Sequence, residues 1–150
     1  MKYLGKITDD KDLVTKEYVD NAVASGGGVT PADYITDYGT DGNWRYRKYN
    51  SGWAECWGNF AFTGITVTTS SAGTYYNAST GKKSQSLPSG LFTSVHSANA
   101  HDGQGTHSSG VYVYDVGGLS TTAVDLNFRA HASTSNGNAP AYIHVYGSWK

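Results

Sequence analysis

Residues 44–58 read WRYRKYNSGWAECWG, and this stretch indicates the fold class of the chain. Two runs rich in aromatic residues flank the segment 50–52, whose Asn-Ser-Gly composition is typical of a hairpin turn. A two-residue turn places Lys48 opposite Glu55, and a three-residue turn places Arg47 there instead. Glu55 gains a cationic neighbour on the facing strand in both registers, which favours pairing. The stretch therefore predicts two strands of an antiparallel hairpin.

Cys56 is the one cysteine of the chain, and it lies in the second run of this hairpin. Alternation along a strand places its side chain on the same face as Ala54, Phe60 and Phe62, which we expect to be the core face. A thiol in an apolar setting has a raised pKa and low reactivity, and it packs as a small hydrophobe. We therefore interpret Cys56 as a core residue and not as a catalytic nucleophile.

The composition of the whole chain favours strands over helices. The 150 residues include 19 glycines and 13% aromatic residues, whereas charged residues make up only 15%. The 11 Lys and Arg residues balance 12 Asp and Glu residues, so the chain lacks the basic excess of a nucleic-acid-binding protein. No apolar run approaches the ~20 residues that a membrane-spanning helix needs. We therefore expect one mainly β domain with a small appendage, without nucleic-acid binding or membrane insertion.

The clearest helix signal lies at residues 13–25, with the sequence LVTKEYVDNAVAS. Thr15 is a candidate N-cap, apolar side chains recur at a spacing of four residues, and the glycines at 26–28 end the pattern. A helix this short is marginal alone in water, and its apolar stripe is as narrow as a coiled-coil seam. We expect it to pack against copies of itself, with packing on its own head domain as the alternative. Its packing residues are predicted to be Leu13, Val14, Tyr18, Val19, Ala22 and Val23.

The chain that follows this helix divides into a linker and a head domain. Residues 26–43 are rich in glycine and turn signals, and they are predicted to form a flexible linker. Residues 44–150 contain successive strand candidates separated by loops of Gly, Ser, Asn and Asp, with no helical interval between them. This pattern predicts an antiparallel β-sandwich or jelly roll. After the hairpin, the strand candidates lie at 64–70, 91–100, 110–116, 122–132 and 141–149.

Alternation within the strand candidates separates a core face from an outer face. In the last candidate, Ile143 and Val145 point one way, and Tyr142, His144 and Tyr146 point the other way. An outer face with this many aromatic residues is unusual for a monomer, so it suggests a second buried surface, most simply between subunits. The same alternation predicts core positions at Val111, Val113, Val124, Leu126, Phe128 and Ala130.

Several stretches of the sequence resemble a known family. DLVTKEYVDNAVA resembles the short trimerising collar near the N-termini of phage tail-fibre and baseplate receptor-binding proteins. ADYITDYGTDGNWRYRKYNSGWAECWG, LFTSVHSANA and AYIHVYGSWK resemble the opening, a middle strand and the closing strand of the β-structured head domain common in phages of Gram-positive hosts. The resemblance implies a homotrimeric virion protein, made in the host cytoplasm, with a short helical bundle and a β-sandwich head. The long shaft of the family is lacking, and residues 1–12 are expected to be an extended anchor that attaches to the virion.

These features lead to one main functional expectation, a non-enzymatic virion fibre or adhesin that binds host cell-surface carbohydrate through its head. Sugar sites of this kind combine an aromatic face with Asp, Asn or Arg side chains that hold hydroxyl groups. A purely structural capsid head fibre or decoration protein is the alternative, and a cell-wall depolymerase is a minor one, since no nucleophile-elbow signature appears. The ligand-binding candidates are Asp102, Gln104 and His107 in one loop, Asn136, Asn138 and Tyr142 in or beside another, and Tyr75, Tyr76 and Asn77 as a third group.

The histidines of the chain do not form a metal-binding motif. His96, His101, Asp102 and His107 lie within twelve residues, but their spacing matches no standard zinc pattern. His144, on the aromatic outer face, is expected to form a hydrogen bond at a subunit interface. We therefore predict neither a metal site nor a cofactor.

Overall fold

The computed structural model describes residues 33–78, 81–108 and 110–150. The predicted anchor at 1–12, the predicted helix at 13–25 and the first part of the predicted linker lie outside the described residues. Residues 35–150 form one unit, and the description below concerns this unit.

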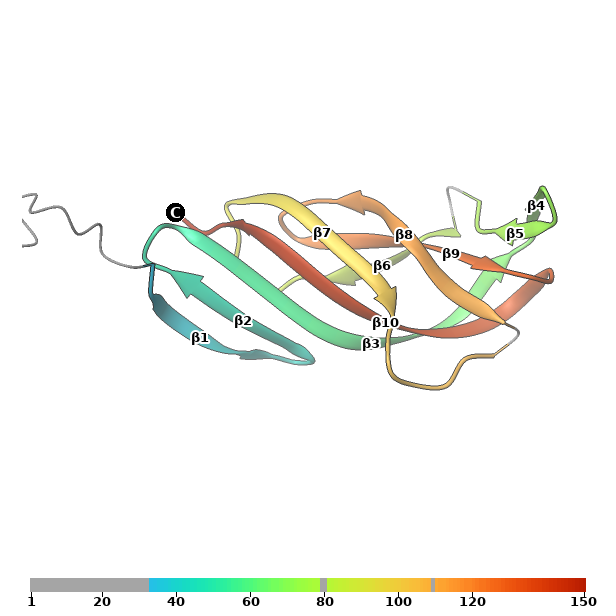
Figure 1. The fold of residues 1–150 in the computed structure, drawn as a ribbon, viewed down its shortest axis with the longest axis horizontal. Helices are drawn as coiled ribbons and strands as arrows, with labels where there is room; N and C mark the ends of the chain where they lie inside the picture. The colour runs from blue at the N-terminus through green and yellow to red at the C-terminus, as the bar shows by residue number, and fades with distance from the viewer. Residues whose placement is uncertain (1–32, 79–80, 109) are drawn as a thin grey trace, which may run out of the picture. The chain divides into compact units, whose positions relative to one another are not determined.

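The first of two antiparallel sheets contains five strands in the order β1-β2-β3-β10-β7 (Figure 1). Two long strands, β3 and β10, run side by side at its centre, and β7 pairs with the free edge of β10. The hairpin of β1 and β2 completes the other edge, because β2 pairs with β3. The strands are β1 (Ile35–Asp41), β2 (Trp44–Tyr49), β3 (Trp53–Val67), β7 (Ser94–Asp102) and β10 (Thr134–Ser148).

The second sheet is built around β9. Strands β5 and β6 pair with successive parts of one edge of β9, β8 pairs with its other edge, and β4 pairs with β5. The expected mainly β fold is confirmed, and two antiparallel sheets are consistent with a β-sandwich. The strands are β4 (Thr69–Ser71), β5 (Thr74–Tyr76), β6 (Lys83–Ser86), β8 (Val111–Leu119) and β9 (Ala123–Ala130).

The inward-facing residues of both sheets form one apolar core. The ring centroids of Phe62 in β3 and Phe128 in β9 lie 5.7 Å apart, so the two sheets meet there. Trp44 of β2 packs on Phe60 at 4.5 Å and donates a hydrogen bond from its indole nitrogen to the carbonyl of Ser86 in β6 (2.7 Å). The alternation expected from the sequence is confirmed, since the following predicted core residues are all buried: Val111, Val113, Val124, Leu126, Phe128, Ala130, Ile143 and Val145.

The β2–β3 hairpin adopts the register of the three-residue turn. Arg47 pairs with Glu55, and the amide of Gly52 donates to the carbonyl of Tyr49 across the turn (3.0 Å). Gly52 has a φ of 95°, a left-handed conformation that glycine adopts at low cost. Cys56 is fully buried, as expected, and burial followed by the nearby charge of Glu55 raises the pKa of its thiol to about 12.

The predicted linker at 26–43 is wrong for its last part, because residues Ile35–Asp41 form strand β1. This strand pairs with β2 through a two-residue turn at Gly42 and Asn43, where Gly42 has a φ of 58°. The head therefore begins by Ile35 and not at residue 44. Almost every side chain of β1 is exposed, so the strand lacks the apolar alternation that identifies a half-buried strand. Backbone pairing holds it instead, with an ion pair between Lys48 and Asp37 (3.4 Å).

Replacing Phe128 with alanine is expected to lower the free energy of unfolding by about 3–5 kcal/mol. Its side chain is fully buried between the sheets, and alanine would leave a cavity beside Phe62. Urea denaturation followed by tryptophan fluorescence measures the change. The matched control is Tyr38→Ala on β1, where the side chain is 78% exposed and a change within about 0.5 kcal/mol is expected. Equal losses in the two variants would contradict the assignment of the core.

Candidate functional site

The outward-facing residues of the first sheet align in rows across its strands, and we call this surface the outer face. In one row, Arg45 pairs with Trp57, Trp57 with His144, and His144 with Asn99. This row and the next draw on β2, β3, β10 and β7, and a third draws on β3, β10 and β7 alone, so residues far apart in the sequence lie next to one another. The neighbouring rows contain Arg47, Glu55, Tyr146 and Ser97 on one side, and Asn59, Tyr142 and His101 on the other.

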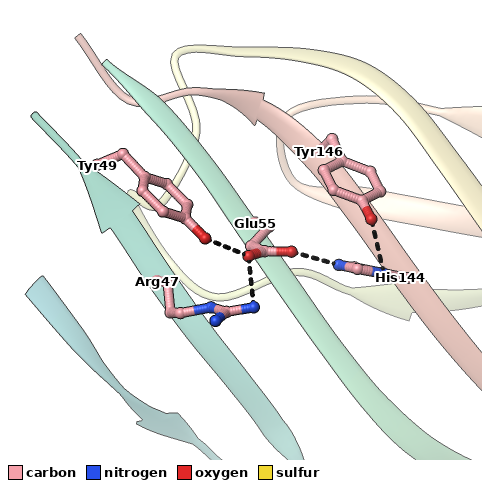
Figure 2. Close-up of polar contacts among 5 residues, drawn as sticks. All are labelled: Arg47, Tyr49, Glu55, His144 and Tyr146. Atoms are coloured by element: carbon pink, nitrogen blue, oxygen red, sulfur yellow. Dashed lines mark hydrogen bonds and ion pairs between the residues drawn. The ribbon is translucent and has the colours of Figure 1, made fainter. Parts of the chain in front are cut away.

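Glu55 is the centre of a polar cluster on the outer face (Figure 2). Its side chain is only 8% exposed. One carboxylate oxygen accepts from the Tyr49 hydroxyl (2.7 Å) and from the Arg47 guanidinium (2.8 Å), and the other accepts from His144 Nε2 (2.7 Å). The hydroxyl of Tyr146 lies 3.1 Å from the second ring nitrogen of His144. The cluster therefore joins β2, β3 and β10 through side chains as well as backbone.

The pKa of Glu55 lies below its ordinary value. Burial alone would raise it, but the hydrogen bonds from Tyr49 and His144 and the charges of Arg47 and His144 outweigh burial. Both carboxylate oxygens are thus occupied, and the group is held in its ionised form. This arrangement positions side chains and leaves no free carboxylate to act as a general base.

The cluster also fixes the position of Trp57. The guanidinium carbon of Arg47 lies 4.8 Å from the centroid of the Trp57 ring, and the ring of His144 meets Trp57 edge-on at 5.9 Å. Glu55 holds both Arg47 and His144, and these two side chains contact the indole ring. Trp57 is therefore supported by the Glu55 cluster.

A depression of about 530 Å³ lies beside Trp57. Of the described residues in its lining, Arg45 alone carries a charge, and it forms no ion pair with any described residue. Tyr142 is the second aromatic residue in the lining. Its ring stacks on that of His101, with the centroids 5.1 Å apart and 24° between the planes, so His101 supports it. The depression is lined by Asn43, Arg45, Trp57, Gly58, Asn59 and Tyr142.

Asn136, Asn138 and Tyr142 are predicted to lie in or beside a loop, but the structure places all three in strand β10. The segment with Gln104 and His107 lies next to this strand, since Ser108 forms a bridge with Asn138. Of the two predicted groups, only Tyr142 lines the depression.

Asp102 accepts a hydrogen bond from the amide of Val113 (2.9 Å) and so joins β7 to β8. The Nδ1 atom of His107 lies 3.0 Å from the carbonyl oxygen of Val111. These two side chains therefore have structural partners.

The 104–108 segment lies against β10 near Asn138. The amide of Asn138 donates to the Ser108 hydroxyl (2.9 Å), and the amide of Ser108 donates to the Asn138 carbonyl (3.0 Å). Gln104 and Asn136 are exposed and do not line the depression.

The sequence pattern does not predict the other five residues that line the depression: Asn43, Arg45, Trp57, Gly58 and Asn59. It assigns Asn43 to the linker and Trp57 to the hairpin alone. The available signal was alternation, which puts Arg45 and Trp57 on the face opposite the core residue Cys56. Their approach to Tyr142 follows from the β3–β10 register, which alternation alone does not specify.

Comparisons with known proteins give no relative. The sequence matches no protein-family model, and neither the search of curated proteins nor the search of solved structures finds a match. In the described ranges, no helix has the length and apolarity to cross a membrane. Within the same ranges, no group of three or more His, Cys, Asp or Glu side chains is placed to hold a metal ion.

Glu55→Gln is expected to lower the free energy of unfolding at pH 7 by about 1–3 kcal/mol, because hydrogen bonds to a buried charge are lost. The folded protein keeps Glu55 ionised to a lower pH than the unfolded chain does. As the pH falls below 4.5, the ordinary pKa of the side chain, the unfolded chain takes up protons at Glu55 before the folded protein does. The wild type therefore loses the part of its unfolding free energy that ionised Glu55 contributes. Denaturation curves from pH 7 to pH 3 measure both effects.

Glu55→Gln has no titrating group at this position. The difference in free energy of unfolding between the variant and wild type is therefore expected to narrow as the pH falls below 4.5. Asp37→Asn is the matched control, since that carboxylate is 49% exposed and its ion pair with Lys48 is on the surface. A constant gap between Glu55→Gln and wild type over the whole range would contradict the assigned direction of the pKa.

Proposed function

We propose that the chain is a non-enzymatic virion fibre or adhesin whose head binds host cell-surface carbohydrate at the depression beside Trp57. The proposal rests on one observation: two aromatic rings, Trp57 and Tyr142, line the same depression. The ring of His144 packs against Trp57, and the ring of His101 packs against Tyr142. The apolar C–H face of a pyranose ring stacks on such rings. Concave sites of this size with a few polar groups are typical ligand sites.

The polar lining of the depression also suits a sugar. Asn43 and Asn59 each carry an amide that both donates and accepts, and sugar hydroxyl groups do the same. Arg45 adds further donors that no described residue occupies as an ion pair. No carboxylate is among the described residues that line the depression, whereas a glycosidase needs a pair of them. These features support binding without hydrolysis.

The proposal includes a homotrimer, with the helix predicted at 13–25 as its collar, residues 1–12 as the virion anchor and a jelly-roll head. Exposed aromatic side chains on the first sheet support association, since Tyr38 is 78% and Trp53 50% exposed. The same observation favours the second candidate, a structural capsid head fibre or decoration protein without a ligand. In that case the aromatic residues serve subunit packing alone.

Trp57→Ala is expected to weaken binding to host cell walls and to the best ligand of a glycan array by at least tenfold, about 1.4 kcal/mol. Tyr142→Ala, which leaves the Glu55 cluster in place, is expected to have a similar effect. Trp53→Ala is the matched control, because it removes an exposed tryptophan from the same strand without touching the depression. Binding that survives both Trp57→Ala and Tyr142→Ala would refute this site, and the absence of any ligand would favour the structural candidate.

Light scattering coupled to size exclusion is expected to give a mass three times that of the 16.0 kDa chain. Tyr18→Asp places a charge in the predicted seam of the helix and is expected to shift the mass toward that of one chain. Glu17→Asp, one residue earlier and outside the predicted packing set, is the control and is expected to leave the mass unchanged. A monomeric wild type would remove the trimer from the proposal and leave the sugar site to be judged by binding alone.

A further inference from the structure

A second depression, of about 490 Å³, lies on the other sheet. Its residues come from β4, β5, β8 and β9, from the turn between β4 and β5 and from the position after β5, so none of them belongs to the outer face of the first sheet. Among the described residues of the lining, Arg129 alone is charged. The lining consists of Ser71, Ala72, Thr74, Tyr76, Asn77, Tyr114, Asn127, Phe128 and Arg129.

The guanidinium of Arg129 stacks on an aromatic ring and has no anionic partner among the described residues. Its central carbon lies 3.2 Å from the centroid of the Tyr114 ring, so the planar group rests on the aromatic face. Its Nε atom is buried and has no hydrogen-bond partner in the part of the chain that the structure describes. No described residue forms an ion pair with Arg129. A buried donor without an acceptor costs free energy, and an oxyanion in the depression would supply acceptors to the guanidinium.

The acidic and amide groups next to Arg129 are already engaged. Asp115 accepts from the Asn127 amide (2.7 Å), and the Asn127 carbonyl oxygen accepts from the amide of Asn77 (3.1 Å). Asn77 in turn accepts from the backbone amide of Phe128 (2.6 Å). This chain of hydrogen bonds joins β8, β9 and the residue that follows β5, and it places the Asp115 carboxylate against Asn127. Arg129 therefore lies beside engaged polar groups, and no described residue neutralises its charge.

We propose that this depression binds a sugar that carries one negative charge, as a carboxylate or a phosphodiester. A single guanidinium balances a single charge, and its planar donors match the two oxygens of either group. Tyr76, on the strand that pairs with Arg129, is partly exposed and offers a ring for the sugar. Ser71 and Thr74 add hydroxyl groups at the rim. The site is separate from the depression beside Trp57 and goes beyond the function proposed for it.

Isothermal titration of the full chain with a methyl galacturonide, with its carboxyl-reduced neutral analogue and with a sugar that carries a single glycerol phosphodiester tests the proposal. Wild type is expected to bind at least one anionic probe tenfold or more tightly than the neutral analogue, and the preference is expected to fall at high salt. The carboxylate and phosphodiester probes distinguish the two sources of the charge. No preference for either anionic probe would overturn the proposal.

Arg129→Gln keeps a planar amide and removes the charge, so it is expected to abolish the preference. Arg129→Lys is expected to retain part of it. Lys83→Gln, on the same sheet and outside the depression, is the control that should bind like wild type. Unchanged preference in Arg129→Gln, or its loss in Arg45→Gln instead, would overturn the assignment.

Two further readouts keep the test independent of variant folding and of the first site. In wild type, the NMR signal of the Arg129 Nε–H group is expected to shift on addition of the anionic probe, and the absence of a shift would overturn the proposal. Binding of neutral glycans through Trp57 is measured separately, so failure at Arg129 and failure of the proposed adhesin function give different results.

Discussion

The pairing of β3 with β10 is the constraint on which both faces of the first sheet depend. The two strands are 15 residues each and are in register along most of their length. Because alternate side chains point to opposite faces, one register decides the core and the outer face together. It brings Cys56 opposite Val145 on the inside and Trp57 opposite His144 on the outside. A slip of one residue would turn the core-facing side chains of one strand outward and its outward-facing side chains into the core.

The buried carboxylate of Glu55 is tolerated because it has three partners. Removal of a charge from water is costly, and one ion pair alone often fails to offset that cost. Here the hydroxyl of Tyr49 and the ring of His144 add hydrogen bonds to the ion pair with Arg47. The result is a fixed geometry rather than a large gain in stability. Arg129 on the second sheet shows the opposite case, a cation that stacks on Tyr114 and whose Nε atom has no acceptor among the described residues.

Local sequence pattern predicted the mainly β fold, the hairpin at 44–58 and the core residues of β9 and β10, because polar and apolar residues alternate there. It did not predict β1, whose exposed side chains carry no such alternation. It identified Tyr142 but not the rest of the depression beside Trp57. The contact between Glu55 and His144 spans 89 positions in the chain, so it depends on strand register and not on any local motif.

The central place of β10 in the first sheet has a consequence for folding. Six strands, β4 to β9, separate β3 from β10 in the sequence, yet β10 lies between β3 and β7. Neither β3 nor β7 can gain its central neighbour until residues up to Ser148 have left the ribosome. Contacts this distant in sequence close slowly, on the order of milliseconds to seconds in all-β domains. Until then, the edges of β3 and β7 that later pair with β10 are unpaired. Unpaired strand edges of this kind make incompletely folded chains prone to aggregation.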